Sequence, residues 1–258
     1  MIDLILVSLT AFIASLLTFF SGFGLGTMLM PVFAIFFPVE IAIALTAVVH
    51  FLNNIFKFFL IGGKTNAKVF LNFGLAAIPA AFAGAFLLVI LSGWDKSLQF
   101  NLLGSDFLIQ PVTAVIGIVM IFFALFEIIP RFKKITFDSS KLWLGGLISG
   151  FFGGLSGHQG AMRSAFLINA GMSKEGFIAT GITIALVVDI VRMGIYASKY
   201  ISKGLIDHWL IMLTAVCAAF IGAILGRLLL KKITYQAIRY IVATFLIVIG
   251  MGLCIGII

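Results

Sequence analysis

The chain consists almost entirely of continuous apolar runs, each at least as long as the roughly 20 residues that a helix needs to cross a bilayer. These runs occupy residues 2–37, 40–61, 69–92, 107–129, 142–170, 175–198, 205–230 and 235–258. Only 10% of the 258 residues are charged, whereas a soluble domain has roughly 25%. The strict alternation of a membrane β-barrel is missing from the runs. We therefore predict an all-α polytopic membrane protein whose exterior contacts the lipid bilayer.

The few charged residues exclude several classes of function. The net charge of +8 is typical of cytoplasmic loops rich in Lys and Arg, and no separate basic domain is present that would bind nucleic acid. Cys217 and Cys254 lie inside apolar runs and are expected to be small buried hydrophobic residues. No metal-ligand spacing and no phosphate-binding loop of the Walker type appears, so we expect no metal, no cofactor and no direct use of ATP.

Two of the apolar runs are interrupted by glycine clusters. The first run is broken at Ser21–Gly26 and the fifth at Gly153–Gly160, and each break leaves a second half too short to span a membrane alone. Backbone that leaves the helix at membrane depth is tolerated where it packs in protein or lines a cavity. Broken segments at corresponding places in two halves are typical of the binding sites of secondary transporters.

The chain also contains an internal repeat. The segment Ala80–Leu87 matches Ala218–Leu225 at six of eight positions. Gly26 aligns with Gly160 in the same comparison. With one residue of slippage, Asn54 and Lys57 align with Asp189 and Arg192. We therefore divide the chain into an N-terminal repeat, 1–135, and a C-terminal repeat, 136–258.

The distribution of Lys and Arg between the links distinguishes two topologies. If each broken run crosses once, eight cationic residues face one side and six the other, which is no asymmetry. If each broken run folds back as a helical hairpin, only Lys96, Lys199 and Lys203 oppose the remaining eleven. The eleven are Lys64, Lys68, Arg131, Lys133, Lys134, Lys141, Lys174, Arg227, Lys231, Lys232 and Arg239. We predict inverted repeats, each a hairpin plus three transmembrane helices, with both termini outside (periplasmic).

The glycine breaks are the first candidates for a binding site. The half-helix after each break begins with free N–H groups and the positive end of its dipole, which favour an anion. Arg163 lies at membrane depth just after the second break, and its guanidinium suits a sulfonate, carboxylate or phosphate. The alternatives are that the glycines only permit close helix packing and that Arg163 is a structural partner of Asp189. The candidate substrate-binding residues are Gly22, Phe23, Gly24, Leu25, Gly26, Ser156, Gly157, His158, Gln159, Gly160 and Arg163.

A second group of polar residues is a candidate for gating or coupling. Asp189 and Arg192 share one helix face and can pair, either as a neutralised ion pair or as a gate. Asn54 and Lys57 are the corresponding pair in the first half, although Lys57 could equally extend to the cytoplasmic interface. His50, like His158, is either a packing residue or a proton carrier. Glu127, Asp207 and His208 lie near run ends and are expected at the interface.

At the glycine breaks the sequence resembles the TauE/SafE sulfite exporter family of the toluene-sulfonate uptake permease superfamily. The family motif G-x-G-G-G, followed shortly by Pro, is matched by Gly22-Phe-Gly-Leu-Gly-Thr-Met-Leu-Met-Pro31, with Leu25 in place of one glycine. The second copy, Ser156-Gly-His-Gln-Gly-Ala-Met-Arg-Ser-Ala165, has Ala165 in place of Pro and resembles a branch with Ser-Gly-x-Gln-Gly-x-x-Arg-Ser. The resemblance implies an inner-membrane permease for sulfite, sulfoacetate or related organosulfonates.

We therefore expect a secondary transporter of a small anion, with an ion or a proton as a candidate coupling partner and a homodimer as a candidate assembly. Two alternatives stay open at this point. An anion channel would share the chemistry of the site. An intramembrane protease of the rhomboid type would use Ser156 in Gly154-Leu-Ser-Gly157, but the later histidine, His208, is expected near the interface. Because a transporter is the leading expectation, we do not expect the protein to be an enzyme.

Overall fold

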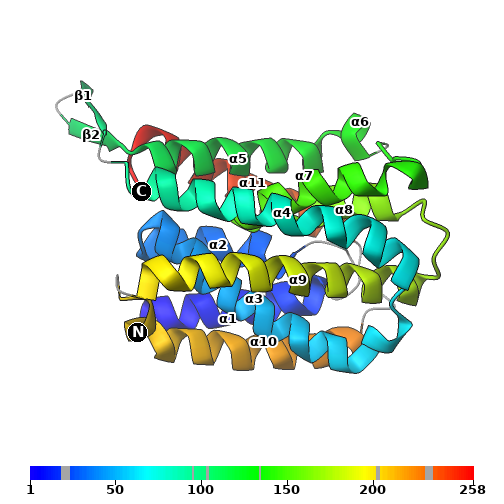
Figure 1. Ribbon diagram of the computed structural model, residues 1–258. Helices are drawn as coiled ribbons and strands as arrows, with labels where there is room; N and C mark the ends of the chain where they lie inside the picture. Colours follow the sequence, from blue (N-terminus) through cyan, green and yellow to red (C-terminus); the bar gives the residue numbers. More distant parts are fainter. Residues whose placement is uncertain (19–23, 95, 103–104, 134, 202–203, 230–234) are drawn as a thin grey trace.

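The fold is a bundle of helices that lie side by side, with one small β-hairpin at an end (Figure 1). The computed structural model describes residues 1–18, 24–94, 96–102, 105–133, 135–201, 204–229 and 235–258. The elements of the first half are α1 (Ile2–Thr18), α2 (Leu25–Phe36), α3 (Val39–Ile61), η1 (Gly62–Lys64), α4 (Ala67–Ser92), β1 (Leu98–Leu102), β2 (Ser105–Ile109), α5 (Pro111–Ile128) and α6 (Pro130–Lys133). Those of the second half are η2 (Ser139–Lys141), α7 (Leu142–Ser156), α8 (Gly160–Leu167), α9 (Lys174–Tyr200), η4 (Leu205–His208), α10 (Trp209–Leu229) and α11 (Tyr235–Ile255).

The predicted all-α membrane fold is confirmed. Within the described residues, five helical segments are long and apolar enough to cross a bilayer: Val39–Lys64, Ala67–Ser92, Pro111–Ile128, Lys174–Tyr200 and Leu205–Leu228. Large apolar side chains such as Phe59, Leu75 and Leu228 are exposed on the outside of the bundle. Such a surface is stable against lipid tails and would aggregate in water.

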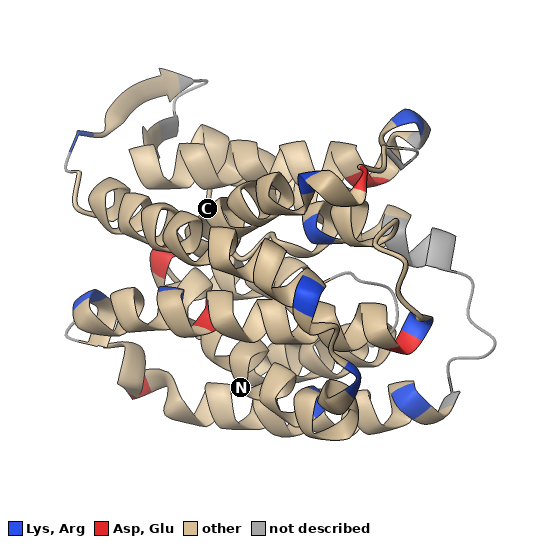
Figure 2. Cartoon of the chain, turned by 45° about the vertical axis from the view of Figure 1, so that its right-hand side comes forward, with Lys and Arg blue, Asp and Glu red and all other residues tan. Residues whose placement is uncertain are grey.

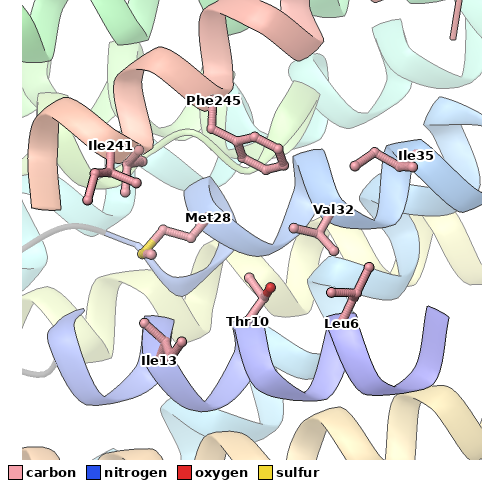
Figure 3. A pocket seen from close by; sticks show the side chains of 9 residues that line it. Leu6, Thr10, Ile13, Met28, Val32, Ile35, Ile241 and Phe245 are labelled. Carbon is pink, nitrogen blue, oxygen red and sulfur yellow. The ribbon is translucent and has the colours of Figure 1, made fainter. Parts of the chain in front are cut away.

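The first broken run folds into an antiparallel pair of helices. In Figure 3, Leu6 of α1 lies near Ile35 of α2, and Ile13 lies near Met28, so the two helices run in opposite directions. Together with α11 they line a cavity of about 390 Å³ that is open to the outside of the bundle. Gly22 and Phe23, which belong to the predicted break, lie outside the described residues.

The second broken run also forms an antiparallel pair. The hydroxyl of Ser149 in α7 donates a hydrogen bond of 3.1 Å to the carbonyl of Gln159, immediately before α8. Nearer the open end of the pair, Gly145 lies against the ring of Phe166. Phe166 stacks on Phe137, with ring centroids 4.0 Å apart. The chain therefore enters through α7, turns inside the protein and returns through α8.

The second break is shorter than predicted, because helix α7 continues through Gly153 and Gly154 to Ser156. Gly146, Gly150 and Gly154 form a stripe with a spacing of four residues that lies against the backbone of α4. A Cβ at any of the three would collide with a carbonyl oxygen of that helix. For Gly154 the close-packing interpretation is therefore correct. The nonhelical part comprises residues 157–159.

The hairpin of β1 and β2 was not predicted from the sequence; it begins between the predicted apolar runs 69–92 and 107–129. The strands pair antiparallel, with Phe100 opposite Phe107 and their rings stacked at 5.2 Å between centroids. Apolar and polar residues alternate in Leu98-Gln-Phe-Asn-Leu102, which is the period of a strand. The predicted helix 107–129 accordingly starts late, at Pro111.

The two helical hairpins open toward opposite ends of the bundle. At one end, Val39 and the C-terminal Ile258 line the same pocket, and Figure 1 shows both termini there. At the other end, Lys64 forms an ion pair with Glu175 at the start of α9. Figure 2 shows most Lys and Arg residues toward this second end. Both observations agree with the hairpin topology, while the repeat relation of the halves and the side that each end faces stay predictions.

Candidate functional site

The tips of the two helical hairpins meet inside the bundle. A Cβ built on Gly26, at the start of α2, would lie 3.7 Å from the carbonyl oxygen of Gly157 and 3.5 Å from the side chain of Thr46. Gly157 has a φ of 81°, which is left-handed, and an added Cβ there would lie 2.8 Å from Nη1 of Arg192. The φ and the contact with Arg192 both favour glycine at position 157, because other residues rarely adopt this φ and a side chain there would collide with the guanidinium of Arg192. Of the predicted site, Gly24, Leu25, Gly26, Gly157 and Gly160 thus lie at this junction.

Two helix N-termini are buried at this junction without a side-chain cap. Gly24 precedes α2 and Gln159 precedes α8; both are buried, and neither N-cap side chain bonds the first-turn amides. By contrast, α4 and α9 are capped by the side chains of Asn66 and Ser173. The starts of α3, α5 and α7 also lack a cap, but the residues before them are exposed and can bond water. A buried helix start without partners is a site for an anion.

The residues just before and within α8 supply further polar groups. The guanidinium of Arg163 donates a hydrogen bond of 3.2 Å from Nη1 to Oε1 of Gln159, and Arg163 is only 8% exposed. Gly181 leaves room for it, since a Cβ there would lie 3.4 Å from Nε of Arg163. Nε2 of Gln159 and Nε2 of His158 are buried and have no hydrogen-bond partner among the described residues. Such orphan groups are costly unless a ligand or water bonds them.

The predicted pairing of Asp189 with Arg192 is present on α9. Oδ1 of Asp189 accepts a hydrogen bond of 2.9 Å from Nε of Arg192 and lies 2.7 Å from Nη2, with both side chains fully buried. The other carboxylate oxygen, Oδ2, lies 2.7 Å from Nδ1 of His50 on α3. Asn54 adds its amide nitrogen 3.4 Å from the same oxygen. This joins four predicted coupling residues into one cluster beside the hairpin tips.

Arg192 and Tyr196 connect this cluster to the second hairpin. Nη1 of Arg192 donates to the carbonyl of Gly153 at 3.5 Å, and the hydroxyl of Tyr196 donates to the carbonyl of Gly154. These carbonyls belong to the last turn of α7, where a helix leaves acceptors unsatisfied and where positive charge is favourable. The sequence analysis missed Tyr196, although it follows Arg192 at a spacing of four on the same helix face.

The structure distinguishes the two alternatives for Lys57. Lys57 does not extend to the surface, because its side chain is only 4% exposed. It lies one helical turn after Asn54 on the same side of α3 and belongs to the buried interior. Glu127 lies in the last turn of α5, at the run end where it was expected, and is 9% exposed; its location at the membrane interface stays a prediction.

The Ser156 region is arranged differently from the protease alternative. The hydroxyl of Ser156 donates to the carbonyl of Phe152 at 3.2 Å, and its oxygen lies 3.1 Å from Nδ1 of His158. The ring of His158 stacks on Phe123, with centroids 5.6 Å apart. His208 packs instead on Phe37, which lines the same pocket as the C-terminal Ile258. The histidine near Ser156 is therefore the one inside the break.

The cavity between α1, α2 and α11 has a different character (Figure 3). Its lining side chains are apolar apart from Thr10. An anion would lose its hydration there without gaining partners, which is strongly unfavourable. The junction of the hairpin tips, with its charged and orphan polar groups, is the candidate anion site.

Comparison with known protein families agrees with this architecture. The family described as sulfite exporter TauE/SafE matches residues 7–253, which is nearly the whole chain. No curated protein matches the chain. The chain therefore belongs to the TauE/SafE sulfite exporter family and is a multi-pass membrane transporter.

Proposed function

We propose that this protein is a secondary transporter of small anions such as sulfite, sulfoacetate or related organosulfonates. The anion binds between the N-termini of α2 and α8, near the middle of the membrane. The observation that carries the proposal is the meeting of two buried, uncapped helix starts, with Gly26 next to the Gly157 carbonyl. Buried N–H groups that have no protein partner are explained if a bound ligand accepts hydrogen bonds from them.

The buried charges support an anionic substrate. Among the described residues, the buried cationic side chains are Lys57, Arg163 and Arg192, and the buried carboxylates are Glu127 and Asp189. Three minus two leaves an excess of one positive charge with the histidines neutral. A bound anion offsets this excess, and a charge at such depth is costly without compensation. Arg163 is the cation nearest the start of α8 in sequence, and its planar guanidinium matches the oxygens of a sulfonate.

The two-hairpin arrangement suits alternating access. Each hairpin enters from one end of the bundle, so movement of one half against the other opens the junction to one side at a time. The contact between Gly26 and Gly157 is the point at which such a movement separates the halves. In this proposal the protein lies in the inner membrane with both termini periplasmic, and the gradients of its substrates set the direction of transport.

Flux measurements on proteoliposomes test the proposal. Labelled sulfite, sulfoacetate, taurine and simple carboxylates are offered to the wild type, to Arg163→Gln and to Arg227→Gln, an exposed cation in the last turn of α10. We expect saturable flux of at least one anion, a loss of about tenfold or more for Arg163→Gln, and no change for Arg227→Gln. Equal flux in all three proteins, or no flux of any anion, contradicts the proposed site.

The same preparation separates the alternatives. A channel gives ohmic currents that do not saturate at low substrate, whereas a carrier saturates. A protease cleaves a membrane substrate and loses this cleavage when Ser156 is replaced by Ala, whereas a transporter shows no cleavage in either protein. Saturable flux of an anion by the wild type, without cleavage of a membrane substrate, supports the carrier.

A further inference from the structure

His50 is held between the carboxylate of Asp189 and the start of α2. Its Nδ1 lies 2.7 Å from Oδ2 of Asp189. Its ring also borders the first hairpin tip, since a Cβ on Gly24 would lie 3.9 Å from Nε2 and a Cβ on Gly26 would lie 3.8 Å from Cδ2. The same imidazole therefore touches the ion-pair cluster on one side and the proposed anion site on the other.

The contact with Asp189 determines which ring nitrogen can take up a proton. An ionised carboxylate only accepts hydrogen bonds, so Nδ1 of His50 carries hydrogen. Asp189 stays ionised because Arg192 holds its other oxygen through Nε and Nη2. In neutral His50 the lone pair therefore lies on Nε2. Protonation adds a second N–H at the edge of the ring that borders Gly24.

Asn54 can accommodate both protonation states of His50. Its Nδ2 lies 3.1 Å from Nδ1 and 3.3 Å from Nε2 of His50, and 3.4 Å from Oδ2 of Asp189, so with hydrogen on Nδ1 its acceptors are Nε2 and the carboxylate. When Nε2 is unprotonated, the amide can donate to it. When Nε2 carries a proton, the amide still has the carboxylate as an acceptor, and the new N–H of His50 is released for another partner.

We infer that His50 binds a proton together with the transported anion, so that the anion and the proton cross the membrane together. This inference rests on the proposed function. The proton added at Nε2 forms an N–H that donates to the anion at the start of α2, and the imidazolium is neutralised by Asp189 and the anion together. When the anion leaves, the imidazolium loses a partner beside a cationic cluster and returns its proton to water.

The surrounding charges favour His50 over the other histidine of the site. On α9 it faces Asp189 and Arg192, and Arg163 of α8, which bonds Gln159, is near enough to act on it by charge; α2 has no titratable side chain. The other elements packed on α3 are η1, α5, η4 and α10. Their titratable side chains lie in terminal turns, except for Cys217 of α10, which is exposed. Those in terminal turns are Lys64, Glu127, Asp207, His208 and Arg227. Among the described residues His158 has no such carboxylate: its Nδ1 contacts the neutral hydroxyl of Ser156, and its Nε2 has no hydrogen-bond partner there. A buried imidazolium needs a counter-charge, and His50 is the histidine that has one.

Proton movement into proteoliposomes tests this inference. Sulfoacetate is the probe, because its acidic groups are already ionised near neutral pH and carry no proton across. A pH-sensitive dye trapped inside reports protons, while exchange of labelled sulfoacetate between the two sides reports the anion site alone. The proteins compared are the wild type, His50→Gln, His158→Gln and the control His208→Gln, whose half-buried histidine packs on Phe37.

We expect sulfoacetate uptake by the wild type to acidify the interior and to accelerate when the outside is made acidic. His50→Gln keeps anion exchange but loses both proton effects, and its apparent affinity falls by about tenfold or more, because a charge-assisted hydrogen bond becomes a neutral one. His208→Gln keeps both the anion exchange and the proton effects, whereas His158→Gln, which alters the proposed anion site itself, lowers exchange but leaves the remaining uptake accompanied by protons. Anion exchange without proton movement in the wild type, or a full proton signal in His50→Gln, overturns the inference while leaving the anion site standing. Absence of anion exchange in the wild type contradicts the proposed function itself.

Discussion

Replacement of Asp189 by Asn removes the negative charge that, within the described part of the chain, contacts both His50 and Arg192. The carboxylate accepts from Nε of Arg192 at 2.9 Å, lies 2.7 Å from its Nη2, and lies 2.7 Å from Nδ1 of His50, with no exposure to solvent. Breaking a buried pair by removing one partner costs about 3–5 kcal/mol, because the remaining charge is left uncompensated. For a chain of this size, 1 kcal/mol corresponds to about 2–4 °C in melting temperature. We therefore expect Asp189→Asn to lower the melting temperature by about 6–20 °C.

The double variant Asp189→Asn with Arg192→Gln distinguishes the two roles of the pair. Removing both charges leaves no unpaired ion, so we expect the double variant to be more stable than either single variant. Thermal unfolding in detergent measures stability, and sulfoacetate exchange in proteoliposomes measures function. Recovery of both quantities means that the pair is structural, whereas recovery of stability without exchange means that the charges act in gating or coupling. Strictly additive losses in the double variant would refute the reasoning, because they would show that the two side chains do not depend on each other.

Two further predictions concern glycines at places where backbones approach closely. Gly157→Ala places a side chain at a φ of 81° and 2.8 Å from Nη1 of Arg192. We expect the backbone conformation alone to lower the free energy of unfolding by about 1–2 kcal/mol, and we expect a larger effect on transport. Unchanged anion flux in this variant would contradict a tight junction. Gly150→Val inserts a branched side chain against the backbone of Ala77 on α4, so we expect poor folding, seen as aggregation in size-exclusion chromatography. Gly63→Val is the matched control, since a Cβ at Gly63 meets nothing within 4 Å, and it should behave as the wild type.

Most of the helical framework could be predicted from the sequence because membrane helices follow a local rule. Helices α3, α4 and α9 begin and end within two residues of the predicted runs 40–61, 69–92 and 175–198. The hairpin of β1 and β2 was missed because five-residue strands give a weak alternating pattern between two strong apolar runs. The extent of the second break was overestimated because glycine has the same local signal whether it ends a helix or packs one against a neighbour. Only the backbone of α4 beside Gly154 distinguishes the two roles.

The candidate site divides in the same way. The glycine clusters, the depth of Arg163 and the i, i+3 spacing of Asp189 and Arg192 are visible in the sequence, because composition and helical spacing act over short stretches of chain. The contact between His50 and Asp189 joins residues 139 positions apart, and neither residue indicates the other in a single sequence. The burial of Lys57 was likewise decided by tertiary packing, since a long cationic side chain can extend to an interface or turn inward from the same place on a helix. The packing of α3 on α9, and the meeting of two hairpins from opposite ends, bring these groups to one point and convert scattered polar residues into a site.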